Sequence, residues 1–178
     1  MPRGVHMTRP RGHSREAGRA FGPLDRSLLV GPLTASDLSD VARHDAEVFG
    51  GNRRPVLEWA LGTAPAYGCL VQSGRDVPQY CLGRRGRLFD QVGPVVAHDD
   101  DTARQLVSTA RRATSGQAIA IDTFDRHTGF TEWLRNSGFA VERPLFRMRR
   151  PPVDGAIRPA DRQRSPLVEF AILGPEFG

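Results

Sequence analysis

The sequence predicts an α/β domain of the α+β type, in which helices flank a mixed, mostly antiparallel sheet with a splayed central strand. Three observations predict this class. Some segments place apolar residues at helical spacing, whereas others are short apolar runs typical of strands. The two kinds of segment follow one another in mixed order, and one strand contains the pair Gly93-Pro94, which interrupts normal strand pairing. A chain of 178 residues is also long enough to bury one core.

The first predicted elements are a short strand over residues 27–31 and two helices. Thr34 or Ser36 caps the first helix, because a hydroxyl oxygen accepts a free N–H group of the first turn. This helix ends at Gly50, since glycine commonly follows a helix. Pro55 suits the first turn of the second, short helix, where its missing N–H costs nothing.

A hairpin follows, with strands over residues 67–73 and 77–83. Cys69 and Cys81 would then lie roughly opposite each other. One alternative is a cross-strand disulfide. The other, which we adopt, is a pair of small buried thiols in a reducing cytoplasm. Two cysteines without CxxC spacing predict no structural metal site.

The next strand, over residues 88–97, carries the interruption. Proline lacks an N–H donor and glycine permits close approach of a neighbour, so the strand is expected to bend or splay at Gly93-Pro94. One of the three consecutive acids at positions 99–101 then caps a helix that buries apolar residues on one face.

Strands and helices continue to the end of the chain. Residues 117–122 form a short apolar strand. A helix over residues 128–136 ends at Gly138, where glycine supplies the left-handed turn. Strands over residues 139–148 and 167–173 complete the predicted sheet.

The net charge of +5 is concentrated in two segments of the chain. Residues 1–26 hold six Arg and two acids, and residues 143–164 hold seven Arg and two acids. The first segment has little apolar periodicity, which predicts a disordered Arg-rich arm over residues 1–26. The domain then covers residues 27–178, with an irregular loop over residues 151–166. We do not predict nucleic-acid binding, because the net charge is the one feature that supports it and charge by itself is not sufficient.

All 25 basic residues are Arg. The absence of Lys excludes P-loop hydrolases, Schiff-base and pyridoxal enzymes, and protein kinases of the usual design, since each needs an amine at a fixed place. No stretch approaches the ~20 apolar residues of a membrane span, and the N-terminus lacks the apolar run of a secretory signal. We therefore expect a cytoplasmic protein with no membrane contact.

Five short runs carry a resemblance to a known family: VGPVVAHDDDTARQL at 92–106, AIDTF at 120–124, WLRNSGF at 133–139, LFRMRR at 145–150 and AILGPEFG at 171–178. Together with the order of elements, they resemble the GNAT acetyltransferases. The resemblance covers about residues 28–178 and is strongest to the GNAT-like C-terminal domain of two-lobed bacterial N-acetyltransferases. It implies an amine acceptor, either a small molecule or a peptide, and as partner a second GNAT-like lobe or a second copy. Either the sequence begins inside a longer gene or the domain works alone.

The same resemblance implies acetyl-CoA as co-substrate. It places the pantetheine arm beside Val95, Val96 and Ala97, whose backbone groups we expect to be exposed at the break. It places the pyrophosphate at the start of the following helix, at Thr102 and Ala103, where backbone N–H groups are free. The acids at positions 99–101 oppose a phosphate there, because each like-charge pair costs about 1 kcal/mol in solvent-like surroundings.

An acetyl transfer of this kind also requires groups that take and give a proton. The candidate bases are Asp90, on the interrupted strand, and Asp122, at the end of the short apolar strand. Asp122 equally suits capping of the following turn. His127 is a third candidate, although it also suits a polar helix start. Leu134 stands where many members of the superfamily carry a Tyr that serves as the acid.

Two functions therefore remain open. The first is an acetyl-CoA-dependent N-acetyltransferase that acts on an amine. The second is a catalytically silent GNAT-like lobe that shapes an acceptor pocket or an interface for a partner GNAT domain. The order of elements and the family-like runs favour the first function, and the acidic turn and the missing Tyr favour the second.

Overall fold

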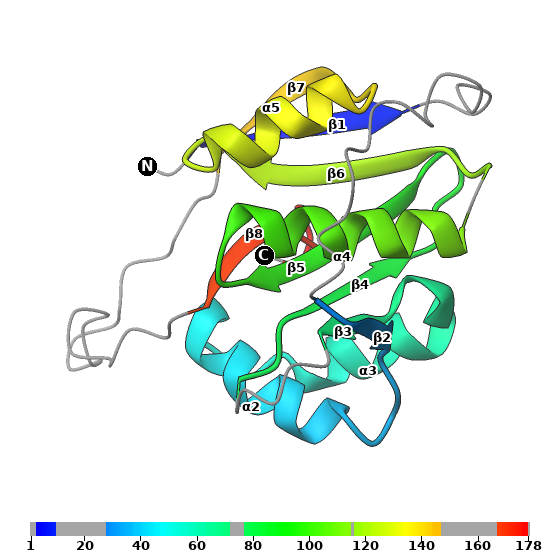
Figure 1. Cartoon of the computed structure of the whole chain (residues 1–178), viewed down its shortest axis with the longest axis vertical. Coiled ribbons are helices and arrows are strands. Elements are labelled where there is room, and N and C mark those ends of the chain that lie inside the picture. The colour runs from blue at the N-terminus through cyan, green and yellow to red at the C-terminus, as the bar shows by residue number, and fades with distance from the viewer. Residues whose placement is uncertain (1–2, 10–27, 72–76, 115, 147–166, 178) are drawn as a thin grey trace.

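The computed structural model describes residues 3–9, 28–71, 77–114, 116–146 and 167–177, which form an eight-stranded sheet with helices on both faces (Figure 1). The strands lie in the order β2-β3-β4-β5-β8-β6-β1-β7. Neighbours in this order are antiparallel, and a short additional pairing of β5 with β6 is parallel. The strands are β1 (Arg3–Arg9), β2 (Val30–Pro32), β3 (Cys69–Val71), β4 (Tyr80–Arg84), β5 (Asp90–Ala97), β6 (Ile119–Phe124), β7 (Ala140–Phe146) and β8 (Val168–Ile172).

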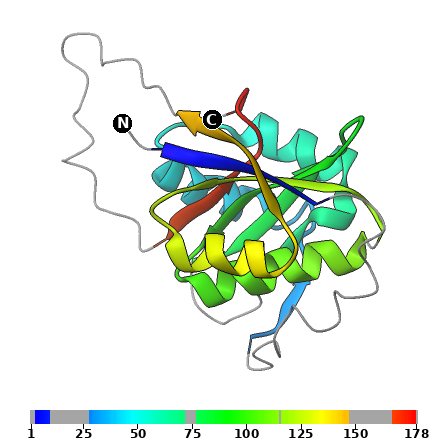
Figure 2. The same cartoon turned by 90° about the horizontal axis from the view of Figure 1, so that it is seen from above.

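Four α-helices in the described part of the chain cover this sheet: α2 (Leu38–Phe49), α3 (Arg54–Thr63), α4 (Asp100–Ala113) and α5 (Thr128–Asn136). A 3₁₀ turn, η2 (Pro65–Tyr67), follows α3. Figure 2 shows α4 and α5 on one side of the sheet and α2 and α3 on the other. The fold class predicted from the sequence is confirmed.

Two apolar cores result from this arrangement. Leu106 of α4 and Phe130 of α5 pack with Ile119 and Ile121 of β6 in the larger core. The second core lies under α2 and α3, which pack against β4 and β8. Because side chains alternate along a strand, the β6 residues next to Ile121 point away from α4 and α5.

The central strand β5 is bent where the sequence predicts it. Val95 pairs with Cys81, whereas Val92 pairs with Gly83, so the register against β4 shifts by one residue across Gly93-Pro94. The extra residue inverts the alternation of side chains along β5. Val92 and Val95, which are three residues apart and would otherwise face opposite sides of the sheet, therefore both face the larger core. β5 and β6 pair only at Asp90 and Gln91. Beyond that point the two strands separate, and β8 lies between them.

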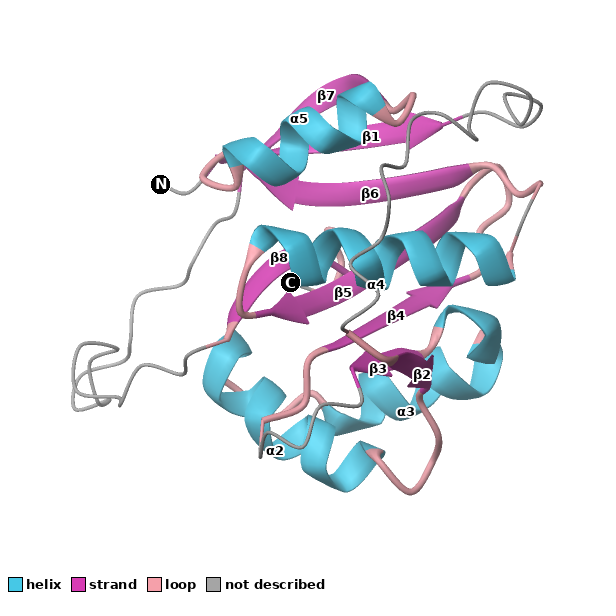
Figure 3. Ribbon diagram, in the orientation of Figure 1, coloured by secondary structure: helices cyan, strands magenta, loops and turns pink. Residues whose placement is uncertain are grey.

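Local signals fix the ends of the later helices (Figure 3). Asp99 is the N-cap of α4, and its Oδ1 accepts the Thr102 N–H at 2.8 Å. Gly138 has a φ of 85°, and the N–H groups of Gly138 and Phe139 donate to carbonyls of the last turn of α5. This bonding is the Schellman motif, for which glycine is favoured.

The predicted cap of the first helix needs a correction. The N-cap of α2 is Asp37, which makes no side-chain cap hydrogen bond. Its carboxylate instead accepts the N–H of Thr34 at 2.8 Å and the Thr34 hydroxyl at 2.7 Å. Thr34 therefore begins the turn that precedes α2, and its hydroxyl serves as a donor to Asp37 rather than as the cap of the helix.

The predicted hairpin is present, and Cys69 lies directly opposite Cys81 in it. Both cysteines are free and buried. None of the helices in the described ranges has the length and apolar character that a bilayer-spanning segment needs. Within the same ranges, no group of three or more His, Cys, Asp or Glu side chains is placed to hold a metal ion.

The prediction of a disordered arm was wrong for residues 3–9. These residues form β1, which pairs with β6 on one side and with β7 on the other. Met7 is fully buried in the larger core. The strand is flanked by Arg, Gly and Pro, and both strands that pair with it lie more than a hundred residues away, so its stability depends on these distant partners. Residues 10–26 of the predicted arm and the predicted loop over residues 151–166 lie outside the described residues.

Candidate functional site

Asp122 of β6, one of the predicted bases, lies in a polar cluster with His6 of β1 and Gln91 of β5. Asp122 is 1% exposed. Its Oδ1 contacts Nδ1 of His6, and its Oδ2 accepts a hydrogen bond from Gln91 Nε2 at 3.2 Å. The three side chains come from strands that are far apart in the sequence. We call these three residues the His6–Asp122 cluster.

The sheet register places this cluster on the face opposite α4 and α5. His6 and Asp122 are directly paired in the antiparallel β1–β6 ladder, so their side chains share one face. Ile121 and Met7, the next residues of the two strands, point into the larger core beneath α4 and α5. The cluster also lies where β5 and β6 part, because Gln91 belongs to the last pair that joins them.

Burial and charge act in opposite directions on Asp122. Burial raises the pKa of the Asp122 carboxyl, while the hydrogen bond and the charge of His6 lower it, and Arg143 also lowers it. The His6 side chain is 19% exposed, so solvent or a ligand can reach the ring. Because Nδ1 faces the carboxylate, Nε2 is the ring nitrogen left to accept a proton.

Asp90 has a different environment. It is buried, and its Oδ2 accepts the hydroxyl hydrogen bond of Tyr67 at 2.6 Å. Its Oδ1 accepts the Gly86 N–H at 3.1 Å, which closes the turn before β5. Asp90 and Gln91 are consecutive in a strand, so Asp90 faces the larger core and not the His6–Asp122 cluster. These contacts describe a carboxylate that organises a turn.

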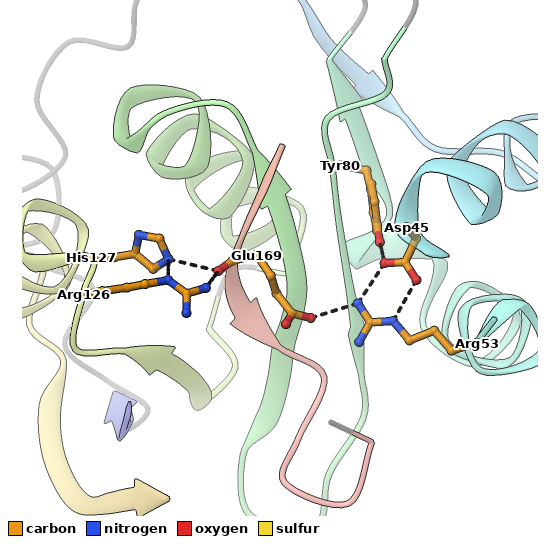
Figure 4. Close-up of polar contacts among 6 residues, drawn as sticks. All are labelled: Asp45, Arg53, Tyr80, Arg126, His127 and Glu169. Atoms are coloured by element: carbon orange, nitrogen blue, oxygen red, sulfur yellow. Dashed lines mark hydrogen bonds and ion pairs between the residues drawn. The ribbon is translucent and has the colours of Figure 1, made fainter. Parts of the chain in front are cut away.

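His127, at the N-cap of α5, contacts neither candidate base. Its ring stacks on Phe170 of β8 with centroids 4.2 Å apart, and its Nε2 lies 3.0 Å from the Glu169 carbonyl oxygen (Figure 4). Burial lowers the pKa of the His127 imidazole, and the charge of Arg126 lowers it further. The structure therefore separates the three predicted proton carriers into three environments.

The residues predicted to bind the pantetheine arm are covered by β8. Val95, Val96 and Ala97 pair with Ala171, Glu169 and Val168 of β8, and their side chains are fully buried. On its other edge the same part of β5 pairs with β4. The expectation of exposed backbone groups at Val95, Val96 and Ala97 was wrong, because β8 pairs with this part of β5. The sequence pattern does not show that a later strand enters the gap between β5 and β6.

The start of α4 is also filled by groups of the chain itself. The Thr102 N–H donates to the Asp99 side chain, and the Ala103 N–H donates to the Asp99 carbonyl at 3.1 Å. The Asp100 carboxylate lies over the first turn of α5, where a Cβ at Gly129 would come within 2.3 Å of it. Carboxylates thus occupy the helix N-termini, which otherwise favour phosphate. In this arrangement the residues at the start of α4 do not fit acetyl-CoA, the co-substrate that the family resemblance implies.

A buried ion-pair network lies under α2 and α3, on the other side of β8 (Figure 4). Arg53 donates two hydrogen bonds of 2.8 Å to Asp45 and one of 2.9 Å to Glu169 of β8. Tyr80 also contacts Asp45. Burial alone would lower the pKa of the Arg53 guanidinium, but the bonds to Asp45 and the charge of Glu169 outweigh it and raise the pKa. The network ties β8 to the helices.

These features were compared with those of known proteins. Residues 41–159 match the family model described as an acetyltransferase (GNAT) domain, so the chain belongs to this family. Among curated proteins, none matches the sequence. The fold is similar to the crystal structure of a GCN5-related N-acetyltransferase from Sphaerobacter thermophilus, with a TM-score of 0.51 and 14% identity. The similarity covers 80% of this chain and 49% of that one, so the chain spans about half the length of that protein.

His6 and Gln91 are the members of the cluster that sequence reasoning missed. The strand of His6 was assigned to the arm, and no local motif marks His6. A signal does exist, because Val5 and Met7 alternate with His6 and Thr8, which is the period of a half-buried strand. The run is short, and only pairing with β6 shows that His6 faces Asp122.

Proposed function

We propose that the chain is an acetyl-CoA-dependent N-acetyltransferase in which His6 accepts the proton of an amine. The observation that supports this most directly is the contact between Nδ1 of the partly exposed His6 side chain and the buried Asp122 carboxylate, on the face opposite α4 and α5 where β5 and β6 part. Membership of the GNAT family supports acyl transfer to an amine as the reaction class. The amine acceptor, a small molecule or a peptide, approaches from this face.

The roles of the cluster follow from its geometry. Asp122 accepts the Nδ1–H of His6, which fixes the tautomer and leaves the Nε2 lone pair free to take a proton. When Nε2 takes the proton, the Asp122 carboxylate stabilises the imidazolium. Gln91 holds the second carboxylate oxygen at 3.2 Å. Asp122 is therefore a positioning residue, and His6 is the group that touches the substrate.

Two measurements test this proposal. Calorimetry with acetyl-CoA is expected to show binding, and release of the CoA thiol is followed with a panel of primary amines. His6→Asn should lower the rate by about 10²–10⁴-fold, the usual contribution of a general base. A control, His44→Gln on α2, should leave the rate unchanged. Equal rates for wild type and His6→Asn would refute the role of His6.

The second candidate function is the catalytically silent lobe. Two observations favour it: β8 fills the gap between β5 and β6, and carboxylates occupy the start of α4. Replacing Asp99, Asp100 and Asp101 together by Asn distinguishes the two candidates. If the chain binds the donor, removal of the negative charges should tighten binding. If neither wild type nor this variant gives heat with millimolar acetyl-CoA while both are folded, the silent lobe is the better account.

A further inference from the structure

We propose that the acceptor of this chain is a small amine that also carries a carboxylate, as an amino acid does, and that Arg143 of β7 binds this carboxylate. Arg143 would then select the acceptor beside His6. The inference rests on the proposed function, because it names the class of amine from which His6 takes a proton. Binding of the acceptor at Arg143 does not depend on where acetyl-CoA lies.

Arg143, His6 and Asp122 form one row across three neighbouring strands. His6 pairs directly with Arg143 of β7 on one side and with Asp122 of β6 on the other. Directly opposed residues of antiparallel strands share a face, with Cβ atoms about 4.5–5.5 Å apart. The His6 side chain is 19% exposed. A group that is bound by Arg143 therefore lies within reach of the His6 ring.

A β-bulge at Glu142 gives Arg143 this position. Val141 pairs with Met7 and Arg143 pairs with His6, so β7 has one extra residue between these two pairs. Without the extra residue, Glu142 would stand opposite His6, and Arg143 would share the face of Met7. Bulges are frequent next to active sites, where they re-aim a side chain. Here the bulge places a cation directly opposite His6.

Arg143 is the available cation on this face of the sheet. Its side chain is exposed, and it forms no ion pair within the described ranges of the chain. Arg84 shares the face, because it pairs directly with Gln91 in the β4–β5 ladder. Arg84, however, already binds Glu176 at 2.6 Å. A carboxylate can therefore bind Arg143 without displacing an acid of the chain.

The acids on the same face favour a ligand with a single negative charge. The Glu142 carboxylate accepts the Thr8 hydroxyl at 2.5 Å, and Thr8 shares the face of His6 because it is two residues further along β1. Asp122 lies beside His6 in the row. These acids repel a doubly charged phosphate more than a singly charged carboxylate, and they attract an ammonium group. An amino acid has both of the charges that this surface favours.

The part of the sheet that carries the row is open to a small ligand. α2 and α3 lie on the same face, but they pack against β4 and β8. The core beneath these helices contains no described residue of β1, β6 or β7. The row therefore lies beside the helices and not under them.

Pairs of acceptors test the role of Arg143 in catalysis. Free amino acids are compared with their carboxamides, which lack the negative charge. Arg143→Gln should lower kcat/KM for the acids at least about fivefold and leave the carboxamides unchanged. Each substrate is compared between two enzymes, so differences in amine basicity cancel. Arg143 is exposed, so the fold should tolerate the change.

Two further variants complete this test. Arg143→Lys keeps the charge and should retain part of the preference for the acids. Arg54→Gln on α3 is the matched control, because Arg54 is an exposed arginine that pairs with Glu58. This control should change kcat/KM for neither kind of acceptor. Equal effects of Arg143→Gln on acids and carboxamides, or no effect on either, would overturn the inference.

Binding can be measured without acetyl-CoA. The imidazole resonances of His6 are identified by NMR as those missing in His6→Asn, and a panel of common amino acids is added to the wild-type chain. At least one amino acid should shift these resonances, with a Kd at least about fivefold lower than in Arg143→Gln. Its carboxamide should bind both proteins alike. Unshifted His6 resonances with every amino acid, in a folded sample, would overturn the inference.

Kinetics and binding together separate failure of this inference from failure of the proposed function. Amino acids that bind through Arg143 while no amine is acetylated would refute the proposed function and, with it, the role of the bound amino acid as acceptor. Acetylation that depends on His6 but uses carboxamides as well as acids would refute selection by Arg143 and leave the proposed function standing.

Discussion

Loss of Arg53 should destabilise the fold far more than loss of its sequence neighbour. The Arg53 side chain is 5% exposed, and it contacts the Asp45 and Glu169 side chains, which are 0% and 4% exposed. Arg53→Met keeps most of the volume but leaves two carboxylates buried without their cation. Removing one partner of a buried pair costs about 3–5 kcal/mol, and we expect a loss of this size. It would be a large part of the roughly 5–15 kcal/mol that is typical of a domain.

The assay is urea unfolding at pH 7 followed by circular dichroism, with the slope m compared between variants. Arg54→Met is the matched control. Arg54 pairs with Glu58 at 2.7 Å, but both side chains are about half exposed, so this change should cost about 0–1 kcal/mol. Similar losses for Arg53→Met and Arg54→Met, at equal m, would refute the view that the network is a buried and interdependent one.

Three further predictions concern single positions. Gly138→Ala should lower the free energy of unfolding by about 1–2 kcal/mol, because φ is 85° at this residue. Gly62→Ala should raise it by up to about 1 kcal/mol, because Gly62 lies in α3 and a Cβ there would meet open space. Urea unfolding of both variants tests these values. Burial raises the pKa of Asp122 in the folded state, so the protonated carboxyl favours folding at low pH, and this contribution is lost as pH rises through the folded-state pKa. The free energy of unfolding of Asp122→Asn should therefore increase relative to that of wild type from about pH 4 upward. A stability difference that does not vary with pH would contradict it. Cys69 and Cys81 should react with Ellman's reagent only as fast as the protein unfolds, since burial raises the pKa of the Cys81 thiol.

The helices and their ends were largely predictable, because their signals are local. Asp99 caps α4 and Gly138 ends α5 through hydrogen bonds within a few residues of each. The break at Gly93-Pro94 was predictable for the same reason, since both residues alter strand pairing directly. Cys69 and Cys81 lie opposite each other, as the predicted hairpin with strands over residues 67–73 and 77–83 implies.

The candidate site was predictable only in part. Asp122 was a predicted base, but its partner His6 was not predicted, because β1 gains its stability from β6 and β7. The contacts of Asp90 with Tyr67 and of His127 with Phe170 likewise depend on packing between distant segments. No local pattern distinguishes these environments from that of Asp122.

The sequence by itself determined the class of fold, the ends of α4 and α5, the broken strand and the acidic start of α4. These follow from dihedral preferences, capping and apolar periodicity, which act over a few residues. Only the tertiary structure decided where β1 and β8 insert, and therefore that His6 meets Asp122 and that the gap beside Val95 is filled. The physical reason is that a strand obtains its hydrogen bonds from other strands, so its place is set by partners that can lie anywhere in the chain.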